Sequence, residues 1–202
     1  QIRTGLRTFD NTFFQSPGRM NVFDEHGFRV ILDYGHNEAA VGAMVDLVDR
    51  LKPRGKRIVC VTCPGDRRDE DVTAIARKVA GHFDVYICHR DDNLRDRGPD
   101  EMPRLMQAAL IAEGVDPAAI TIIEEEDKAL AAALERAERD DLILFFCEAI
   151  TRSWKQIINF EPAFGAAEPE PVSSRLAASG FDVPSGYMVN SDARGVLIVP
   201  QA

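Results

Sequence analysis

Short apolar runs alternate with longer amphipathic stretches along most of this chain, and this alternation constrains the fold more than any other feature. The runs predicted as buried strands occupy residues 27–34, 57–63, 84–89, 119–125 and 142–148. The stretches between them, at residues 37–52, 69–83, 101–114 and 126–141, place apolar side chains at the spacing of one helix face. Strands that alternate with such helices predict right-handed crossovers and an α/β fold with a doubly wound, mostly parallel sheet.

Further segments flank this α/β unit. Residues 11–33 contain three β-like runs separated by turn signals, which predict an N-terminal antiparallel meander. A closing helix is predicted with Thr151 as its N-cap. The sequence then becomes rich in Pro, Ala and Glu, as linkers are, and residues 187–199 predict a hairpin. We therefore expect an α/β domain over residues 1–162, followed by a linker and a C-terminal β-hairpin over residues 163–202.

The charge of the chain argues against two classes of partner. Its 202 residues carry a formal net charge of -9, so a concentrated basic face for nucleic acid or a membrane surface is not expected. No apolar run is long enough to span a bilayer, and the first residues lack the pattern of a secretion signal, so we expect a cytoplasmic protein. The chain does not begin with Met, and we expect it to be a fragment of a longer one.

Several kinds of site are missing from the sequence. The four cysteines, Cys60, Cys63, Cys88 and Cys147, lie in or beside apolar runs and are predicted as small buried residues, with neither a disulfide nor a zinc site. No P-loop, no dinucleotide-binding glycine fingerprint, no nucleophile elbow and no metal-ligand spacing of histidines is found. A complete nucleotide-hydrolysing site is therefore not expected here.

Polar residues interrupt the change from strand to helix after the first long strand, at Asp33, Gly35, His36 and Asn37. In a parallel sheet, ligands bind beyond the carboxyl ends of the strands, where helix N-termini present N–H groups to anions. A carboxylate, an imidazole and an amide would converge there. The alternative is that Asn37 only caps the helix and that His36 is a solvated loop residue.

Two more polar loops follow strands at the same predicted edge of the sheet. Asp66, Arg67 and Arg68 could hold a phosphate, a carboxylate or a zwitterion, whereas the acids at residues 69–71 are better explained as matching the helix dipole. The loop after the next strand carries Arg95 among alternating charges. Alone it would be a surface loop, but a third polar loop strengthens the prediction of a site.

Other residues of note have simpler interpretations. Arg19 follows a tight Ser-Pro-Gly turn, and a lone arginine there is usually a surface residue. The acidic residues 124–126 are predicted to begin a helix, and Trp154 is predicted to serve packing. Neither of the last two features is given a functional role.

Three stretches resemble one known family. "SPGRMNVFDEHGFRVILDYGHN", "CPGDRRDED" and "AITRSWKQII" are similar to the C-terminal domain of the Mur ligase superfamily, over residues 5–160. These enzymes are ATP-dependent amide ligases. Within the superfamily the resemblance is strongest to the cyanophycin synthetases, whose polymer has an aspartate backbone with arginine side groups.

The resemblance implies a Rossmann-like fold and a division of labour between domains. Such ligases activate a carboxylate as an acyl phosphate with ATP and Mg²⁺, and an amine then attacks it. The P-loop, the magnesium ligands and the catalytic lysine belong to an upstream central domain, so no catalytic residue and no metal ligand is expected in this fragment.

Residue roles follow from the same resemblance. Arg19 would approach the phosphates, Asp33 the ribose or a bound water, and His36 and Asn37 the nucleotide. The side chains near the incoming amino acid, arginine by resemblance, would be Asp66, Arg67, Arg68 and Arg95. The acceptor would be an aspartate side-chain carboxyl.

The chain also departs from the family. Glu38 stands where the family commonly has proline, and the tail beyond residue 165 matches no known pattern. A binding or regulatory module that keeps the fold without ligase chemistry therefore stays an alternative. A dinucleotide enzyme is disfavoured because the glycine fingerprint is missing. Homo-oligomerisation is left open.

Overall fold

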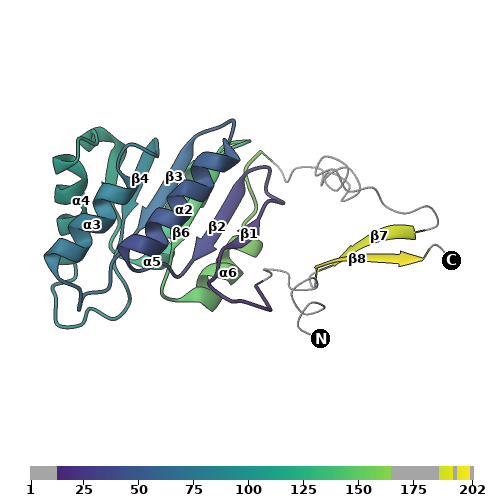
Figure 1. Ribbon diagram of the computed structural model, residues 1–202, viewed down its shortest axis with the longest axis horizontal. Helices are drawn as coiled ribbons and strands as arrows, with labels where there is room; N and C mark the ends of the chain where they lie inside the picture. The colour runs from purple at the N-terminus through teal and green to yellow at the C-terminus, as the bar shows by residue number, and fades with distance from the viewer. Residues whose placement is uncertain (1–12, 165–186, 193–194, 201–202) are drawn as a thin grey trace.

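The computed structural model describes residues 13–164, 187–192 and 195–200 (Figure 1). Its main sheet contains β1 (Asn21–Phe23), β2 (Arg29–Asp33), β3 (Arg57–Val61), β4 (Val85–Cys88), β5 (Ile120–Ile122) and β6 (Leu142–Phe146). The helices are α2 (Glu38–Leu51), α3 (Asp69–Val79), α4 (Glu101–Ala112), the 3-10 helix η1 (Pro117–Ala119), α5 (Glu126–Arg136) and α6 (Ile150–Ile158). The strand order is β1-β2-β6-β3-β4-β5, with β1 antiparallel to β2 and the other pairs parallel.

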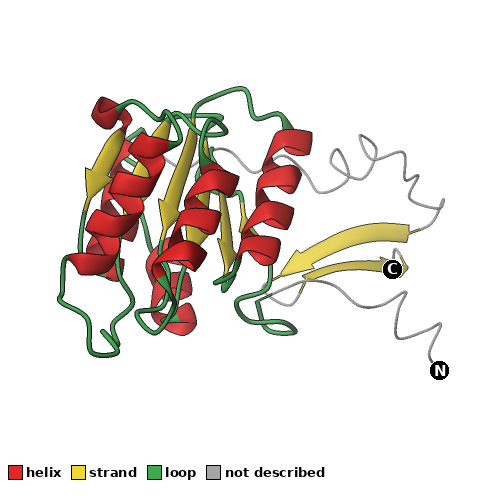
Figure 2. Cartoon of the chain, turned by 60° about the vertical axis from the view of Figure 1, so that its left-hand side comes forward, coloured by secondary structure: helices red, strands yellow, loops and turns green. Residues whose placement is uncertain are grey.

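The direction in which the chain crosses the sheet explains its layers. From β2 to β5 successive strands are added in one direction, and the chain then returns to insert β6 between β2 and β3. Because crossovers are right-handed, reversing the direction moves the connecting helix to the opposite face. Accordingly α2, α3 and α4 pack on one face and α5 and α6 on the other, as Figures 1 and 2 show. The predicted doubly wound, mostly parallel sheet is confirmed.

The predicted N-terminal meander is shorter than expected. Two of its three runs form the antiparallel pair β1–β2, but the backbone turns at residues 13–16. Phe13 stacks on Trp154 of α6, with ring centroids 4.9 Å apart, and the Asn21 side chain donates a hydrogen bond to the Ser16 carbonyl at 3.0 Å. These contacts replace strand pairing. The packing role predicted for Trp154 is confirmed.

The end of α4 follows a common local pattern, whereas the predicted N-cap of α6 is wrong. Gly114 follows α4 with φ +92°, the left-handed conformation typical after a helix C-terminus. Helix α6 begins at Ile150 with Ala149 at the cap, so Thr151 is not its N-cap. The free N–H groups there are bound instead by the carboxylate of Glu126 on α5. The cap therefore comes from another helix.

The C-terminal hairpin forms a separate two-stranded antiparallel sheet of β7 (Tyr187–Asp192) and β8 (Gly195–Pro200). Both strands are longer than the runs predicted from the sequence. Most of the predicted linker falls in residues 165–186, outside the described residues, and the division at residues 162–163 stays a prediction. Among the helices that the structure describes, none has the length and apolarity needed to cross a membrane.

Candidate functional site

The polar loops after β2, β3, β4 and β6 meet at one edge of the sheet, because these strands are parallel (Figure 2). Strand β6 lies between β2 and β3, so the residues after β6 lie between the first two loops. The candidate site therefore has two parts, one on the β2 side and one on the β3–β4 side.

On the β2 side, the carboxylate of Asp33 holds two segments together. Its Oδ2 accepts a hydrogen bond of 2.8 Å from the backbone N–H of Met20, and its Oδ1 accepts one of 2.7 Å from the N–H of Gly35. The residue is only 7% exposed. Gly35 is required by this close approach, since a Cβ there would lie 2.9 Å from Asp33 Oδ1. Asp33 thus joins the turn before β1 to the loop after β2.

The turn before β1 carries Arg19 to the surface. Gly18 adopts φ +71°, and its N–H donates a hydrogen bond of 2.7 Å to Asn21 Oδ1. The exposed Arg19 guanidinium lies over the Tyr34 ring, 5.8 Å from the centroid, a distance at which a cation is attracted to the ring face. Within the described part of the chain, Arg19 forms no ion pair. Its charge is available to an anion.

His36 and Asn37 have different environments in the loop after β2. His36 Nδ1 donates a hydrogen bond of 3.0 Å to the Tyr34 carbonyl, which leaves Nε2 as the ring nitrogen for another partner. Asn37 caps α2, its Oδ1 accepting from the Ala40 N–H at 3.0 Å. Asn37 therefore caps α2, and its nucleotide role stays a prediction. Glu38 pairs with Lys78 of α3 at 3.3 Å, so its carboxylate is directed towards α3.

On the β3–β4 side, Arg95 connects three loops. Its Nη1 donates to Asp66 Oδ1 at 2.8 Å and its Nη2 to Glu148 Oε1 at 3.3 Å. These partners follow β3 and β6, and Arg95 itself lies in the loop after β4. The hydrogen bond from Arg95 is the largest cause that lowers the pKa of Asp66. The structure thus brings together Asp66 and Arg95, two of the predicted residues.

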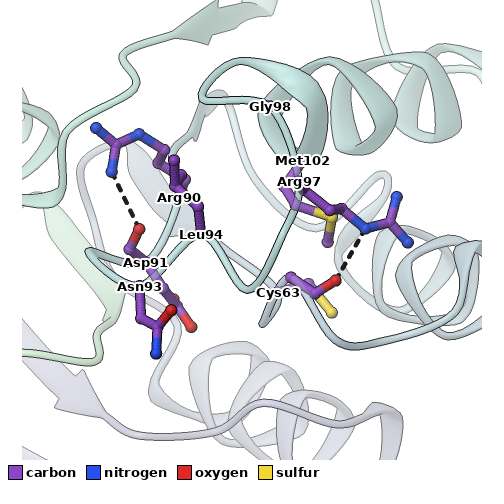
Figure 3. Close-up of a pocket in the computed structure, with 9 residues that line it drawn as sticks. Cys63, Arg90, Asp91, Asn93, Leu94, Arg97, Gly98 and Met102 are labelled. Atoms are coloured by element: carbon purple, nitrogen blue, oxygen red, sulfur yellow. Dashed lines mark hydrogen bonds between the residues drawn. The ribbon is translucent and has the colours of Figure 1, made fainter.

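Arg97 fixes the shape of the loop after β3 (Figure 3). Its guanidinium donates hydrogen bonds to the carbonyls of Gly65 and Arg67, at 2.9 and 2.8 Å. Arg68 pairs at 2.9 Å with Asp71 in the first turn of α3. The side chain of Arg67 is exposed and forms no ion pair with the residues described. Arg67 and Arg68 therefore do not join the contacts around Arg95.

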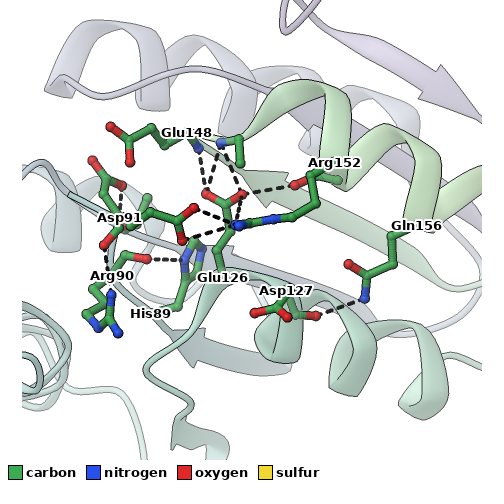
Figure 4. A network of polar contacts seen from close by, with 12 residues as sticks. His89, Arg90, Asp91, Glu126, Asp127, Glu148, Arg152 and Gln156 are labelled. Carbon is green, nitrogen blue, oxygen red and sulfur yellow. Dashed lines mark hydrogen bonds and ion pairs between the residues drawn. The ribbon is translucent and has the colours of Figure 1, made fainter.

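Sequence reasoning missed three acidic residues at this edge (Figure 4). Asp91 follows β4, is 5% exposed and accepts a hydrogen bond of 3.1 Å from Thr62 Oγ1. Glu148 follows β6 and binds Arg95. Glu126 is fully buried. The places of Asp91 and Glu148 at strand ends are signals that could have identified them, whereas Glu126 sits in an acidic helix start that carries no such signal.

All four cysteines are free and buried, as predicted. Burial raises the pKa of Cys63 and Cys88 to about 12. These thiols stay protonated near neutral pH and pack as small apolar groups.

The chain is similar to known ligases. Residues 18–148 match the family model described as Mur ligase, glutamate ligase domain. The cyanophycin synthetase of Trichormus variabilis is 38% identical over 164 residues, covering 78% of this chain and 17% of the relative. That of Crocosphaera subtropica is 35% identical, covering 75% and 17%. A UDP-N-acetylmuramoyl-L-alanyl-D-glutamate--2,6-diaminopimelate ligase of Rickettsia typhi is 30% identical, covering 63% and 24%. The chain thus spans under a fifth of these cyanophycin synthetases.

Solved structures agree on the fold. A UDP-N-acetylmuramoyl-L-alanyl-D-glutamate--2,6-diaminopimelate ligase superposes with a TM-score of 0.58 at 17% identity, covering 78% of this chain and 36% of the other. A bifunctional folylpolyglutamate synthase/dihydrofolate synthase from Yersinia pestis, complexed with AMPPNP and Mn, gives 0.56 at 20%, covering 78% and 33%. The chain belongs to the Mur ligase family, in which it is a C-terminal domain.

Proposed function

We propose that this domain positions nucleotide and amino acid in an ATP-dependent amide ligase of the cyanophycin synthetase type. The reaction adds arginine to an aspartate side-chain carboxyl through an acyl phosphate. One observation carries the proposal: Arg19, which has no ion pair among the described residues, and the Asp66–Arg95–Glu148 cluster lie on the same edge of the sheet in a Mur ligase domain.

The β2 side fits a nucleotide phosphate. Arg19 offers an exposed guanidinium without an ion pair in the described residues, and His36 offers Nε2. Both oxygens of Asp33 already accept hydrogen bonds from backbone N–H groups. Its role in the proposal is therefore to hold the segments that carry Arg19 and His36 in place. Asn37 orders the N-terminus of α2 by capping it. ATP supplies the phosphoryl group that activates the carboxylate.

The proposal places Mg²⁺ on the upstream central domain. No group of three or more potential metal-ligating side chains occurs among the residues described here. Arg19 would add positive charge at the phosphates to the charge that the metal supplies.

The β3–β4 side fits an amino acid that carries extra positive charge. Arg95 can pair with the α-carboxylate, because a guanidinium matches a carboxylate in geometry and charge. Its present partners, Asp66 and Glu148, would then be released to bind a cationic side chain. The cluster has two acidic residues and one arginine residue, so it carries an excess negative charge. This excess supports a cationic amino acid, arginine, as the substrate.

Positioning explains what such a domain contributes without a nucleophile of its own. When it closes on the central domain, water is excluded from the reactive acyl phosphate and the amine is aligned with the acyl carbon. Fixed positive charge at Arg19 stabilises the phosphate that leaves.

The test uses the complete polypeptide with its central domain, assayed for ATP-dependent arginine incorporation. Arg19→Ala and His36→Ala should raise the KM for ATP, and Arg95→Ala the KM for arginine, each roughly tenfold or more. Arg54→Ala is the matched control, an exposed arginine at the opposite end of β3. Unchanged kinetics in both β2-side variants would remove the nucleotide role. ATP binding without arginine-dependent turnover would favour the alternative of a regulatory module. The structural hydrogen bonds of Asp33 and Asn37 are also compatible with that alternative.

A further inference from the structure

Asp91 is a nearly buried carboxylate that follows the C-terminal end of β4, and it has no role in the function proposed above. It lines a small, partly open pocket between the loops after β3 and β4, together with Cys63, Asn93 and Arg97 (Figure 3). Its Oδ1 accepts a hydrogen bond of 3.1 Å from Thr62 Oγ1 at the end of β3. The hydroxyl fixes the orientation of the carboxylate.

Four neighbouring acids differ from Asp91 because each has a cationic partner. Asp66 and Glu148 share Arg95. Asp92 and Glu126 share Arg152, at 2.6 and 3.2 Å (Figure 4). In the described part of the chain, no cation forms an ion pair with Asp91. This buried carboxylate therefore remains open to a new cation or proton.

The charges around Asp91 come from several elements. Glu148 after β6 and Glu126 on α5 oppose its ionisation, whereas Arg95 in its own loop and the Thr62 hydroxyl favour it. The thiols of Cys63 and Cys147, which also face it, stay protonated. Burial is the largest effect and, with Glu148, raises the pKa of Asp91 to about 6. At neutral pH the group is ionised and still basic enough to take a proton.

The ligation proposed above requires an uncharged amine, whereas an amino acid arrives as an ammonium ion at neutral pH. Resting on that proposed function, we propose that Asp91 is a catalytic residue that accepts a proton from the incoming α-ammonium group. The ammonium N–H bond breaks, its proton joins the carboxylate, and the nitrogen lone pair is freed.

The rest of the step then balances. The lone pair forms the C–N bond at the acyl carbon, the C–O bond to phosphate breaks, and the second ammonium proton leaves with the phosphate. Glu148 suits this role less well, because the proposed function already assigns its carboxylate to the cationic side chain of the substrate once Arg95 releases it.

The decisive experiment compares two nucleophiles on the complete ligase. Asp91→Asn should lower kcat with arginine roughly 100-fold or more, because an amide accepts no proton. With hydroxylamine, which is uncharged at neutral pH, the same variant should keep most of its activity. The acidic limb of the wild-type kcat profile, with an apparent pKa of about 6, should disappear in the variant. Asp96→Asn, an exposed acid of the same loop, is the matched control and should behave as wild type.

The outcomes separate this inference from the proposed function. A wild-type protein that joins no amine in an ATP-dependent manner would overturn both. An active wild type, with equal losses for arginine and hydroxylamine in Asp91→Asn, would overturn the proton-acceptor role alone. Full activity of Asp91→Asn with arginine would likewise overturn the proton-acceptor role of Asp91.

Discussion

The backbone N–H of Met20 donates a 2.8 Å hydrogen bond to the carboxylate of Asp33, across thirteen positions of the chain. This contact fixes the turn that carries Arg19 against the loop that carries His36. The placement of the two proposed nucleotide contacts therefore depends on a buried acid that lies between them. Asp33 has a structural role that its sequence motif does not reveal.

Asp33→Asn should weaken this junction. The amide offers one acceptor oxygen for two N–H groups, so one buried donor loses its partner, at a cost of about 1–3 kcal/mol in the free energy of unfolding. Urea denaturation measures the change. The exposed Asp46→Asn on α2 is the control and should stay within about 0.5 kcal/mol of wild type. An equal effect in both variants would show that the Asp33 contacts contribute nothing.

Gly18→Ala should be more destabilising than Gly81→Ala. Both glycines have positive φ, +71° and +79°, but a Cβ on Gly18 would lie 2.6 Å from Ile150 Cδ1, while nothing lies within 4 Å of one on Gly81. We expect about 1 kcal/mol for Gly81→Ala from backbone strain and more for Gly18→Ala. In an Ile150→Val background, which lacks Cδ1, the cost of Gly18→Ala should fall towards that of Gly81→Ala. Thermal unfolding of wild type, Gly18→Ala, Gly81→Ala, Ile150→Val and the double variant gives the comparison.

The strands and the place of the β2 loop were predictable because they depend on local patterns. Strands such as β6, in which every residue is buried, read as continuous apolar runs, and parallel strands share one carboxyl edge. His36 could therefore be assigned to the carboxyl edge of the sheet without knowledge of the strand order.

The strand order itself was not predictable from local patterns. The insertion of β6 between β2 and β3 places Glu148 beside Arg95, although 53 positions separate them. Likewise, the cap of α6 comes from Glu126, more than twenty positions upstream, and not from the nearby Thr151. Such pairings depend on tertiary packing, and neighbouring residues carry no sign of them.

Glu126→Ala should be strongly destabilising. The carboxylate is fully buried and accepts hydrogen bonds from the N–H groups of Glu148 and Ala149, from Ser153 Oγ and from Arg152. Its removal leaves the two N–H groups and the Ser153 hydroxyl unpaired, whereas Arg152 keeps its pair with Asp92, and we expect a loss of about 3 kcal/mol or more. Urea denaturation gives the total effect, and faster hydrogen exchange at the amides of Glu148 and Ala149 would locate it.

The neighbouring Glu125→Ala provides the control for Glu126. Glu125 forms only an exposed pair with Lys128, so its loss should cost less than about 1 kcal/mol. Similar losses for the two variants would contradict the capping role of Glu126.

His89→Phe should remove part of the acid sensitivity of the fold. The His89 ring is 1% exposed and stacks on Phe145 at 5.3 Å, and burial lowers its pKa to about 4. The unfolded chain binds a proton on this side chain near pH 6.5, so between about pH 6.5 and 4 the unfolded state binds more protons. Stability is therefore lost as the pH falls through this range, by up to about 1.4 kcal/mol per pH unit.

Phenylalanine at position 89 keeps the stacking and does not titrate. The free energy of unfolding of His89→Phe, minus that of wild type, should rise as the pH falls from about 6.5 to 4, measured by urea denaturation. The opposite contribution of Asp91 is present in both proteins and cancels in this difference. Parallel curves would mean that His89 is protonated in the folded state as readily as in the unfolded chain.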